Sequence, residues 1–234
     1  MAPGLSRQAI PEAVSFAVSG VMTRRGQSEY ALFNRGLFST YLRPSALLGI
    51  RTFDVLDVPH VVSHLPLAPA LIVSPEEREA RTKQGCFDLT VVLDDVRDPQ
   101  LGRDLLEQKR ERLLRAGVKE EDDSGEISLW SFRAAQFSTA WASAIEHLAL
   151  GTLCTTPYQN RHGGPSRDIQ LKLRTMEEVQ KRGHWKAASS LRNYEKAGRL
   201  HKVVAAIPVP VMTFGEKFRL YFAAVARPSS WPVG

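Results

Sequence analysis

The spacing of apolar residues is the feature that most limits how this chain can fold. Over most of the sequence these residues recur at helical intervals, but residues 53–93 carry short β-branched and apolar runs separated by Pro59, Pro66 and Pro69. Proline cannot donate to a strand ladder, so it marks the ends and edges of strands. We therefore predict a mainly helical α+β fold with a small antiparallel sheet in this stretch.

Local signals place several helices on either side of the sheet. Gly117 suits the C-cap of a helix over residues 101–116, and Thr175 with Glu178 forms a capping-box pattern whose helix closes at Gly183. Pro44 fits the first turn of another helix. Further helices are expected at 11–22, 30–40 and 129–150 and around Tyr194, with a short apolar piece at 218–225 and a turn at Gly163-Gly164-Pro165.

Charge is unevenly distributed along the 234 residues, which carry a net charge of +6. Residues 158–202 hold 11 basic and 4 acidic residues, whereas residues 76–126 hold 15 acidic and 10 basic ones. A basic stretch that also contains tyrosine and histidine is typical of surfaces that meet a phosphate backbone. A solvated basic helix pair is the plain alternative, and the acidic middle is expected to be solvated as well.

Other classes of protein fit the sequence poorly. Cys86 and Cys154 are far apart and lack metal-ligand spacing, so neither a disulfide framework nor a cysteine metal site is expected. The first ten residues have no long apolar run, and no run elsewhere is long enough for a membrane span. We expect an intracellular protein with no membrane partner.

Arg43 stands at a predicted helix entry within residues 40–48, Arg161 lies within residues 157–162, and Gly183-His184-Trp185 is followed by Tyr194. These three pieces resemble the catalytic domain of the tyrosine recombinases, which break and rejoin DNA. The first is similar to the family's first arginine box, the second to its second box, and the third to its Gly-His/Trp corner and nucleophilic tyrosine. Trp185 precedes Tyr194 by nine positions and His184 follows Arg161 by twenty-three, both usual intervals in the family.

The resemblance covers about residues 11–202, and it implies a catalytic domain at 1–202 with a C-terminal extension at 203–234. Lys83 lies between two predicted strands and matches the family's hairpin lysine. Family members usually carry an N-terminal DNA-clamping domain, whereas about forty residues precede Arg43 in this sequence. We therefore expect a weak unaided grip on DNA, and a chain that is a fragment, a domesticated remnant or one half of a larger system.

The resemblance also implies a role for each matched residue. Arg43 and Arg161 would clamp the phosphate oxygens, whose charge grows in the transition state. Tyr194 would attack phosphorus and form a 3′-phosphotyrosine, with Lys83 protonating the leaving 5′ oxygen. His184 or Trp185 would donate a hydrogen bond to a phosphate oxygen. For each, ordinary packing or a surface salt bridge is the alternative.

Two positions depart from the family pattern. Tyr158 stands where the second box has a histidine, and a phenol can donate a hydrogen bond but takes up no proton at neutral pH. Ala46 stands where an acidic residue commonly orients the first arginine. His162 is not the missing histidine by position, and we interpret it as structural.

The sequence therefore favours site-specific DNA recombination or integration on double-stranded DNA, without a cofactor or metal, in a homotetramer. The protein would lie with DNA, in the nucleus of a eukaryote or the cytoplasm or nucleoid of a prokaryote. Two alternatives stay open: a catalytically impaired DNA-binding protein that keeps the fold, and a basic helical scaffold with no DNA role.

Overall fold

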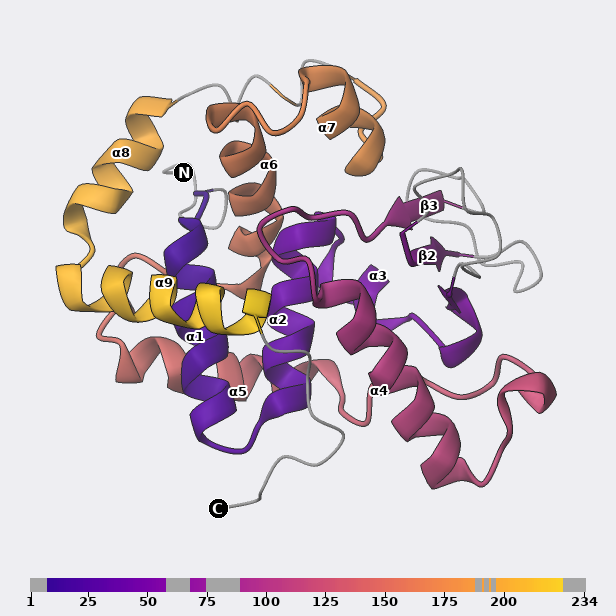
Figure 1. The fold of residues 1–234 in the computed structure, drawn as a ribbon. Coiled ribbons are helices and arrows are strands. Elements are labelled where there is room, and N and C mark those ends of the chain that lie inside the picture. Colours follow the sequence, from indigo (N-terminus) through magenta and orange to yellow (C-terminus); the bar gives the residue numbers. More distant parts are fainter. Residues whose placement is uncertain are drawn as a thin grey trace.

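The computed structural model describes residues 8–57, 68–74, 89–187, 191, 194 and 197–224. It is mainly helical with a small antiparallel sheet, as expected (Figure 1). The helices are α1 (Glu12–Arg24), α2 (Ser28–Thr40), α3 (Pro44–Leu48), α4 (Leu101–Ala116), α5 (Ala134–His147), α6 (Asn160–Gln170), α7 (Met176–Arg182), α8 (Ala197–Ala206) and α9 (Val209–Ala224). Of these, none is both long and apolar enough to cross a membrane.

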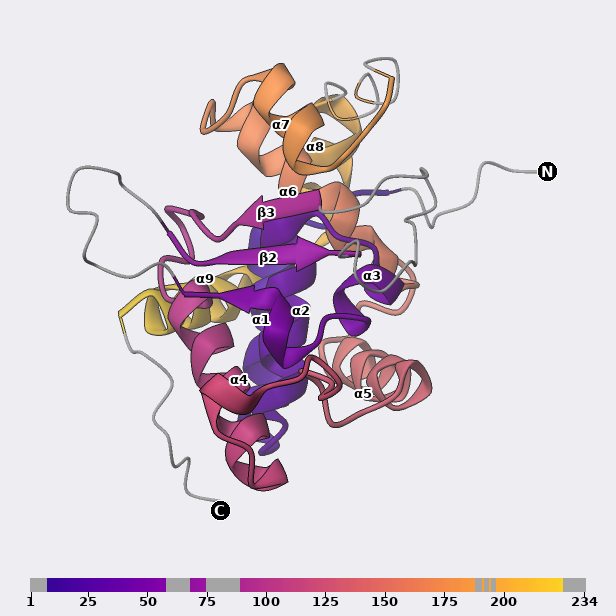
Figure 2. The ribbon, with the colours of Figure 1, turned by 90° about the vertical axis from the view of Figure 1, so that its right-hand side faces the viewer.

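The sheet contains β1 (Val55–Leu56), β2 (Ala70–Val73) and β3 (Leu89–Val92), paired in that order and antiparallel throughout. Leu71 pairs with Val55 on one side and Val91 on the other, and all three side chains are buried. The sheet lies on the side of α2 away from α1, as Figures 1 and 2 together show. Lys83, the proposed hairpin lysine, falls outside the described residues, as do Cys86 and the prolines at 59 and 66.

The core is built around α1, which is buried along almost its whole length. Neighbouring helices cover it on several sides, and α9 lies across it (Figure 1). A Cβ added at Gly215 would come 1.8 Å from the Ala13 carbonyl oxygen, so only glycine allows α9 to approach α1 this closely. Helix α9 is thus longer than the expected piece at 218–225, and Phe222 packs against Phe16 with ring centroids 6.2 Å apart.

Residues 163–165 form no turn; that expectation is wrong. They lie inside α6, where a Cβ at Gly163 would come 2.4 Å from the Ile10 carbonyl oxygen and one at Gly164 would come 2.1 Å from the Phe38 carbonyl oxygen. The glycines therefore serve close helix packing rather than chain reversal. This packing seats α6 against the end of α2.

The helix expected at 129–150 is shorter, because α5 begins only at Ala134. The Gln136 side chain accepts a hydrogen bond from the Arg133 backbone N–H and fixes the helix start. Before it, the Trp130 indole donates to the Leu47 carbonyl at 2.7 Å, which fixes this stretch to the end of α3. After His147, Ala149 takes a left-handed conformation that ends the helix.

The acidic middle of the chain is not all solvated. Asp95, Asp98 and Asp104 are buried, and each accepts hydrogen bonds from an arginine. Arg35 on α2 bridges Asp98 and Asp104, while Arg167 on α6 binds Asp95. Removing one partner of such a buried pair would strongly destabilise the fold, because the remaining charge would be unpaired and shielded from water. Part of the basic stretch at 158–202 is therefore neutralised inside the fold.

We predict that Gly164→Ala destabilises the protein by about 1–3 kcal/mol or more, because the added methyl group meets backbone rather than a movable side chain. At an ordinary helical position the same change would be stabilising. Urea unfolding measures the effect. Gly151→Ala is the control, since a Cβ there has no neighbour within 4 Å; equal stability of both variants would contradict the packing.

Candidate active site

Arg43 is placed by the junction between α2 and α3. Tyr41 ends α2 with a left-handed backbone at φ 60°, and the chain then turns so that Arg43 becomes the N-cap of α3. The Arg43 carbonyl accepts the backbone N–H of Ala46 and of Leu47 at 2.9 and 3.0 Å. Pro44 occupies the first helical turn, as expected, and the Arg43 side chain is half-buried.

Arg161 is placed by a buried polar cluster at the start of α6. Asn160 accepts from Ser15 at 2.8 Å and donates to Asn34 at 2.9 Å, which ties this helix start to α1 and α2. The Arg161 guanidinium, 3% exposed, donates to the carbonyl of Tyr41 and, at 3.0 Å, to that of Gly183. Its carbon lies 4.7 Å from the Trp185 ring centroid, a cation–π contact.

Arg43 and Arg161 have no carboxylate counterpart among the described residues. The contrast with the other buried arginines is plain, since Arg35, Arg167 and Arg182 are each paired with aspartate or glutamate. Burial lowers the pKa of Arg161, and the positive charge of Arg43 lowers it further. The two guanidiniums therefore sit close enough to repel each other, which makes the site a strong attractor for an anion.

The Gly183-His184-Trp185 corner follows α7 and faces this pair. A Cβ at Gly183 would come 1.8 Å from the Trp185 ring, so a larger residue would displace the indole. His184 has a left-handed backbone at φ 52°, and its buried Nε2 atom has no hydrogen-bond partner in the described part of the chain. Burial, then the charges of Arg161 and Arg43, lower the pKa of His184 to about 4, so its ring is neutral at physiological pH.

Tyr194 lies in a turn rather than on a helix, because α8 begins only at Ala197. Its backbone N–H donates to the Leu191 carbonyl at 2.8 Å, and its ring packs with Tyr41, Val179 and Leu191 in a small apolar cluster. Burial raises the pKa of Tyr194 to about 12 although the Arg161 charge acts in the opposite direction. In this state the phenol is neutral and covered.

The Tyr194 hydroxyl contacts His162 Nδ1 at 3.0 Å, a contact that the interpretation of His162 as a structural residue did not foresee. The Tyr158 ring contacts the His162 ring edge-on, and their centroids are 5.3 Å apart. The available signal was spacing, because residues 158 and 162 are four apart and so lie on the same face where the chain is helical. Arg43, Tyr158, Arg161, His184, Trp185 and Tyr194 are thus gathered around one place, whereas Lys83 lies outside the described residues.

Behind the site, Tyr41 and Asp168 hold the framework. The Tyr41 hydroxyl donates to Asp168, which also binds Arg167 at 2.6 Å and Arg174 at 2.7 Å. Burial, then the negative charge of Asp168, raise the pKa of Tyr41, so the hydroxyl remains a donor. The carbonyl of the same tyrosine receives Arg161, which links the buried ion pairs to the unpaired arginine.

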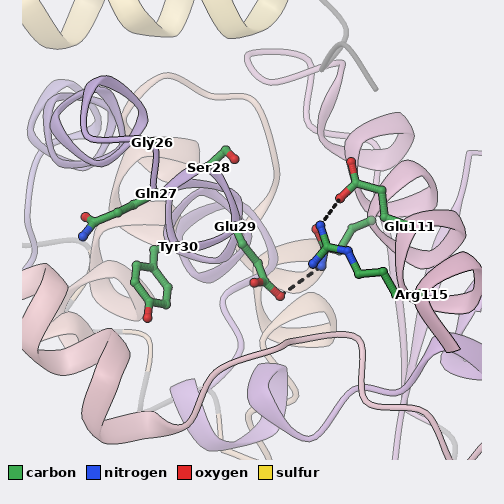
Figure 3. Close-up of a pocket in the computed structure, with 8 residues that line it drawn as sticks. Gly26, Gln27, Ser28, Glu29, Tyr30, Glu111 and Arg115 are labelled. Atoms are coloured by element: carbon green, nitrogen blue, oxygen red, sulfur yellow. Dashed lines mark hydrogen bonds and ion pairs between the residues drawn. The ribbon is translucent and has the colours of Figure 1, made fainter. Parts of the chain in front are cut away.

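One hollow elsewhere in the described structure suits this chemistry less well. Figure 3 shows it, with a volume of about 290 Å³, between the end of α1, the start of α2 and α4. Its Glu29 accepts from Gln108 and from the Ser131 backbone and so ties α2 to α4 and to the stretch before α5, while Arg115 and Glu111 pair within α4 at 3.7 Å. Within the described residues, no three His, Cys, Asp or Glu side chains gather as metal ligands would.

We predict that one phenol titrates near pH 12 and that Tyr194→Phe removes this component from the tyrosinate absorbance curve. Because the folded chain favours the neutral phenol, this group's contribution to stability is full below pH 10, its ordinary value, and is lost as the pH rises through about 12. A difference curve centred near pH 10 would show that the ring is exposed instead.

No protein-family model matches the sequence, and no curated protein matches it significantly. Solved structures do. XerH site-specific recombinase bound to palindromic difH substrate, in a post-cleavage complex, superposes with a TM-score of 0.57 and 13% identity, over 85% of this chain and 53% of that chain. The pre-cleavage complex of XerH with difH gives the same TM-score and identity over 85% and 52%.

The chain spans about half the length of these recombinase chains. At 13% identity the likeness concerns the fold, and the site geometry has to be argued from this chain's own residues. The resemblance in the arginine boxes and the backbone superposition point to the same architecture. The chain has the fold of a tyrosine-recombinase catalytic domain.

Proposed function

We propose that this protein cleaves and rejoins double-stranded DNA by transesterification, with Tyr194 forming a 3′-phosphotyrosine. The reaction conserves the energy of the broken ester in the protein–DNA bond, so it needs no energy-supplying cofactor. Both similar structures are of XerH, a site-specific recombinase, which supports this assignment. Recombination or integration at specific sites is the outcome proposed.

The pair of uncompensated guanidiniums carries the proposal. A phosphodiester has two charged non-bridging oxygens, and arginine presents planar donors that match them while staying charged at every relevant pH. Arg43 and Arg161 come from different helices, repel each other and have no described carboxylate partner, so an anion between them would relieve the repulsion. A basic helical scaffold with no DNA role would not need such an arrangement.

The remaining site residues have roles that follow from their donors. Neutral His184 has a buried Nε2 without a described partner beside both arginines, so it can donate to a phosphate oxygen. Trp185 holds Arg161 by its ring face, and Tyr158 can donate a hydrogen bond through its phenol. Lys83 is proposed as the general acid for the 5′ oxygen.

A catalytically impaired DNA-binding protein is the second candidate, and one observation favours it. Tyr194 is 4% exposed, its ring is packed among apolar side chains, and burial raises its pKa to about 12. For catalysis the phenol must leave this packing or receive the phosphate where it lies. A protein that only binds DNA would have no need of that step.

Double-stranded DNA is the proposed partner, since both neighbours are described as bound to their difH substrate. We also propose a homotetramer on paired sites, association with DNA inside the cell, and a catalytic domain ending near residue 202. In the structure α9 packs on α1 of its own chain and leaves Leu220 exposed, so docking of this helix on a neighbouring copy would use its outer face.

The first test is covalent capture. The protein is incubated with nicked duplexes of randomised sequence, denatured, and assayed for protein that carries DNA. We expect an adduct with the natural chain and none with Tyr194→Phe, because only the phenol supplies the attacking oxygen. If the protein retards DNA but forms no adduct, it is the DNA-binding protein instead. If it does neither, the basic helical scaffold with no DNA role is the remaining interpretation.

The second test concerns the anion clamp. The substrate is a nicked duplex with a sequence recovered from the adducts of the first test. On it, Arg43→Gln should slow adduct formation by ~10²–10³-fold, the usual effect of losing one hydrogen-bond donor to the transition state. Arg103→Gln removes the same charge from an exposed position on α4 and should act only through general DNA affinity. An equal effect of both substitutions on the single-turnover rate at saturating protein would contradict a specific clamp.

A further inference from the structure

We propose that His162 is the general base that accepts the Tyr194 proton during strand cleavage, in place of the absent histidine at position 158. The assignment rests on the proposed function and deepens it by naming a catalytic residue that the pattern of the sequence boxes does not supply.

Contact is the first step of the argument. His162 Nδ1 lies 3.0 Å from the Tyr194 hydroxyl, within the reach required of a general base. The His162 and Tyr194 rings are tilted by 33° and their centroids are 5.7 Å apart, so the contact joins the edge of the imidazole to the hydroxyl end of the phenol. A nitrogen that accepts this bond carries a lone pair, which corresponds to the tautomer protonated at Nε2.

Position is the second step. His162 directly follows Arg161 on α6, whose start is tied to α1 and α2 through Asn160. The base and Arg161, one of the two arginines of the phosphate clamp, are therefore carried by the same helical turn. Proton transfer in the transition state requires a base that is held rigidly near the nucleophile, because a base must lie within hydrogen-bond reach of the proton before its pKa matters.

Need is the third step. A phenol whose pKa is raised to about 12 by burial cannot be ionised beforehand at neutral pH, so its proton has to leave as the oxygen attacks. Tyr158 takes up no proton there, and His184 is turned toward the arginine pair with its pKa lowered to about 4. The titratable side chains seen to contact the His162 ring include Tyr158 and Tyr194, and the Arg161 charge is next to it in sequence.

The step balances as follows. The Tyr194 O–H bond breaks while its oxygen bonds to phosphorus, and the proton passes to His162 Nδ1 to give an imidazolium. The P–O5′ bond breaks with its electron pair on the 5′ oxygen, which takes a proton from the proposed acid, Lys83. In rejoining, the 5′-hydroxyl attacks and returns its proton to that amine, while the departing phenolate recovers its own proton from the imidazolium.

The test compares His162→Asn with the natural chain on captured nicked DNA. Asparagine keeps an oxygen acceptor near the Nδ1 position but cannot take up a proton, so a merely structural hydrogen bond would be rescued. We expect adduct formation to slow by ~10²–10⁴-fold with DNA retardation unchanged. The rise of the natural chain's rate with pH through the imidazole titration should also disappear.

Three controls separate the outcomes. His147→Asn changes an exposed histidine on α5 and should leave the rate unchanged, and melting temperatures, with His162→Gln as a second variant, verify folding. An adduct from the natural chain with an unchanged rate and pH profile in His162→Asn overturns the base assignment alone. No adduct from the natural chain overturns the proposed function and this inference together.

A readout without DNA checks the contact itself. In protein carrying ¹⁵N-labelled histidine, Tyr194→Phe should shift the His162 Nδ1 resonance and its titration, because the hydroxyl donor is lost. Resonances unaffected by that substitution would contradict the inference even if cleavage occurs.

Discussion

The buried guanidinium of Arg161 is the interaction on which the rest of the site depends. It joins the start of α6 to two other pieces of chain. It donates to the carbonyl of Tyr41 at the end of α2, and it donates to the carbonyl of Gly183 and contacts the Trp185 ring in the corner after α7. Hydrogen bonds of a charged donor contribute about 1.5–3 kcal/mol each, and a desolvated cation–π contact about 2 kcal/mol. Burying an ion costs several kcal/mol, so these contacts roughly offset the cost and leave the charge free to act on an anion.

The basic stretch therefore divides into two groups of arginines with different physics. Arg167, Arg174 and Arg182 are matched with Asp95, Asp168 and Asp94 and stabilise the packing of α6 and α7 against the sheet end. Arg43 and Arg161 have no such match among the described residues. Arginines of the same basic character therefore stabilise the fold where a carboxylate lies beside them and form an anion site where none does. Only the neighbouring side chains distinguish the two groups.

The environment of Tyr194 shows how a site can combine a packed resting state with a reactive group. The ring belongs to an apolar cluster that favours the neutral phenol, while the hydroxyl meets the imidazole of His162. His162 lies one residue after Arg161, and its ring also contacts Tyr158, which stands at the histidine position of the second box. In the proposed reaction His162 is the proton acceptor that Tyr158 cannot be.

The sequence by itself determined the fold class, the order of the arginine boxes and the caps at Pro44, Gly117 and Thr175, because these depend on local periodicity and backbone preference. It misjudged residues 163–165, since two glycines before a proline favour a turn locally, while contact with Phe38 and Ile10 demands a glycine inside a helix. Only the tertiary structure decided that Arg161 has no carboxylate partner among the described residues, that Asp95 is buried, and that His162 meets Tyr194. These properties depend on distances between residues far apart in sequence, which local patterns do not contain.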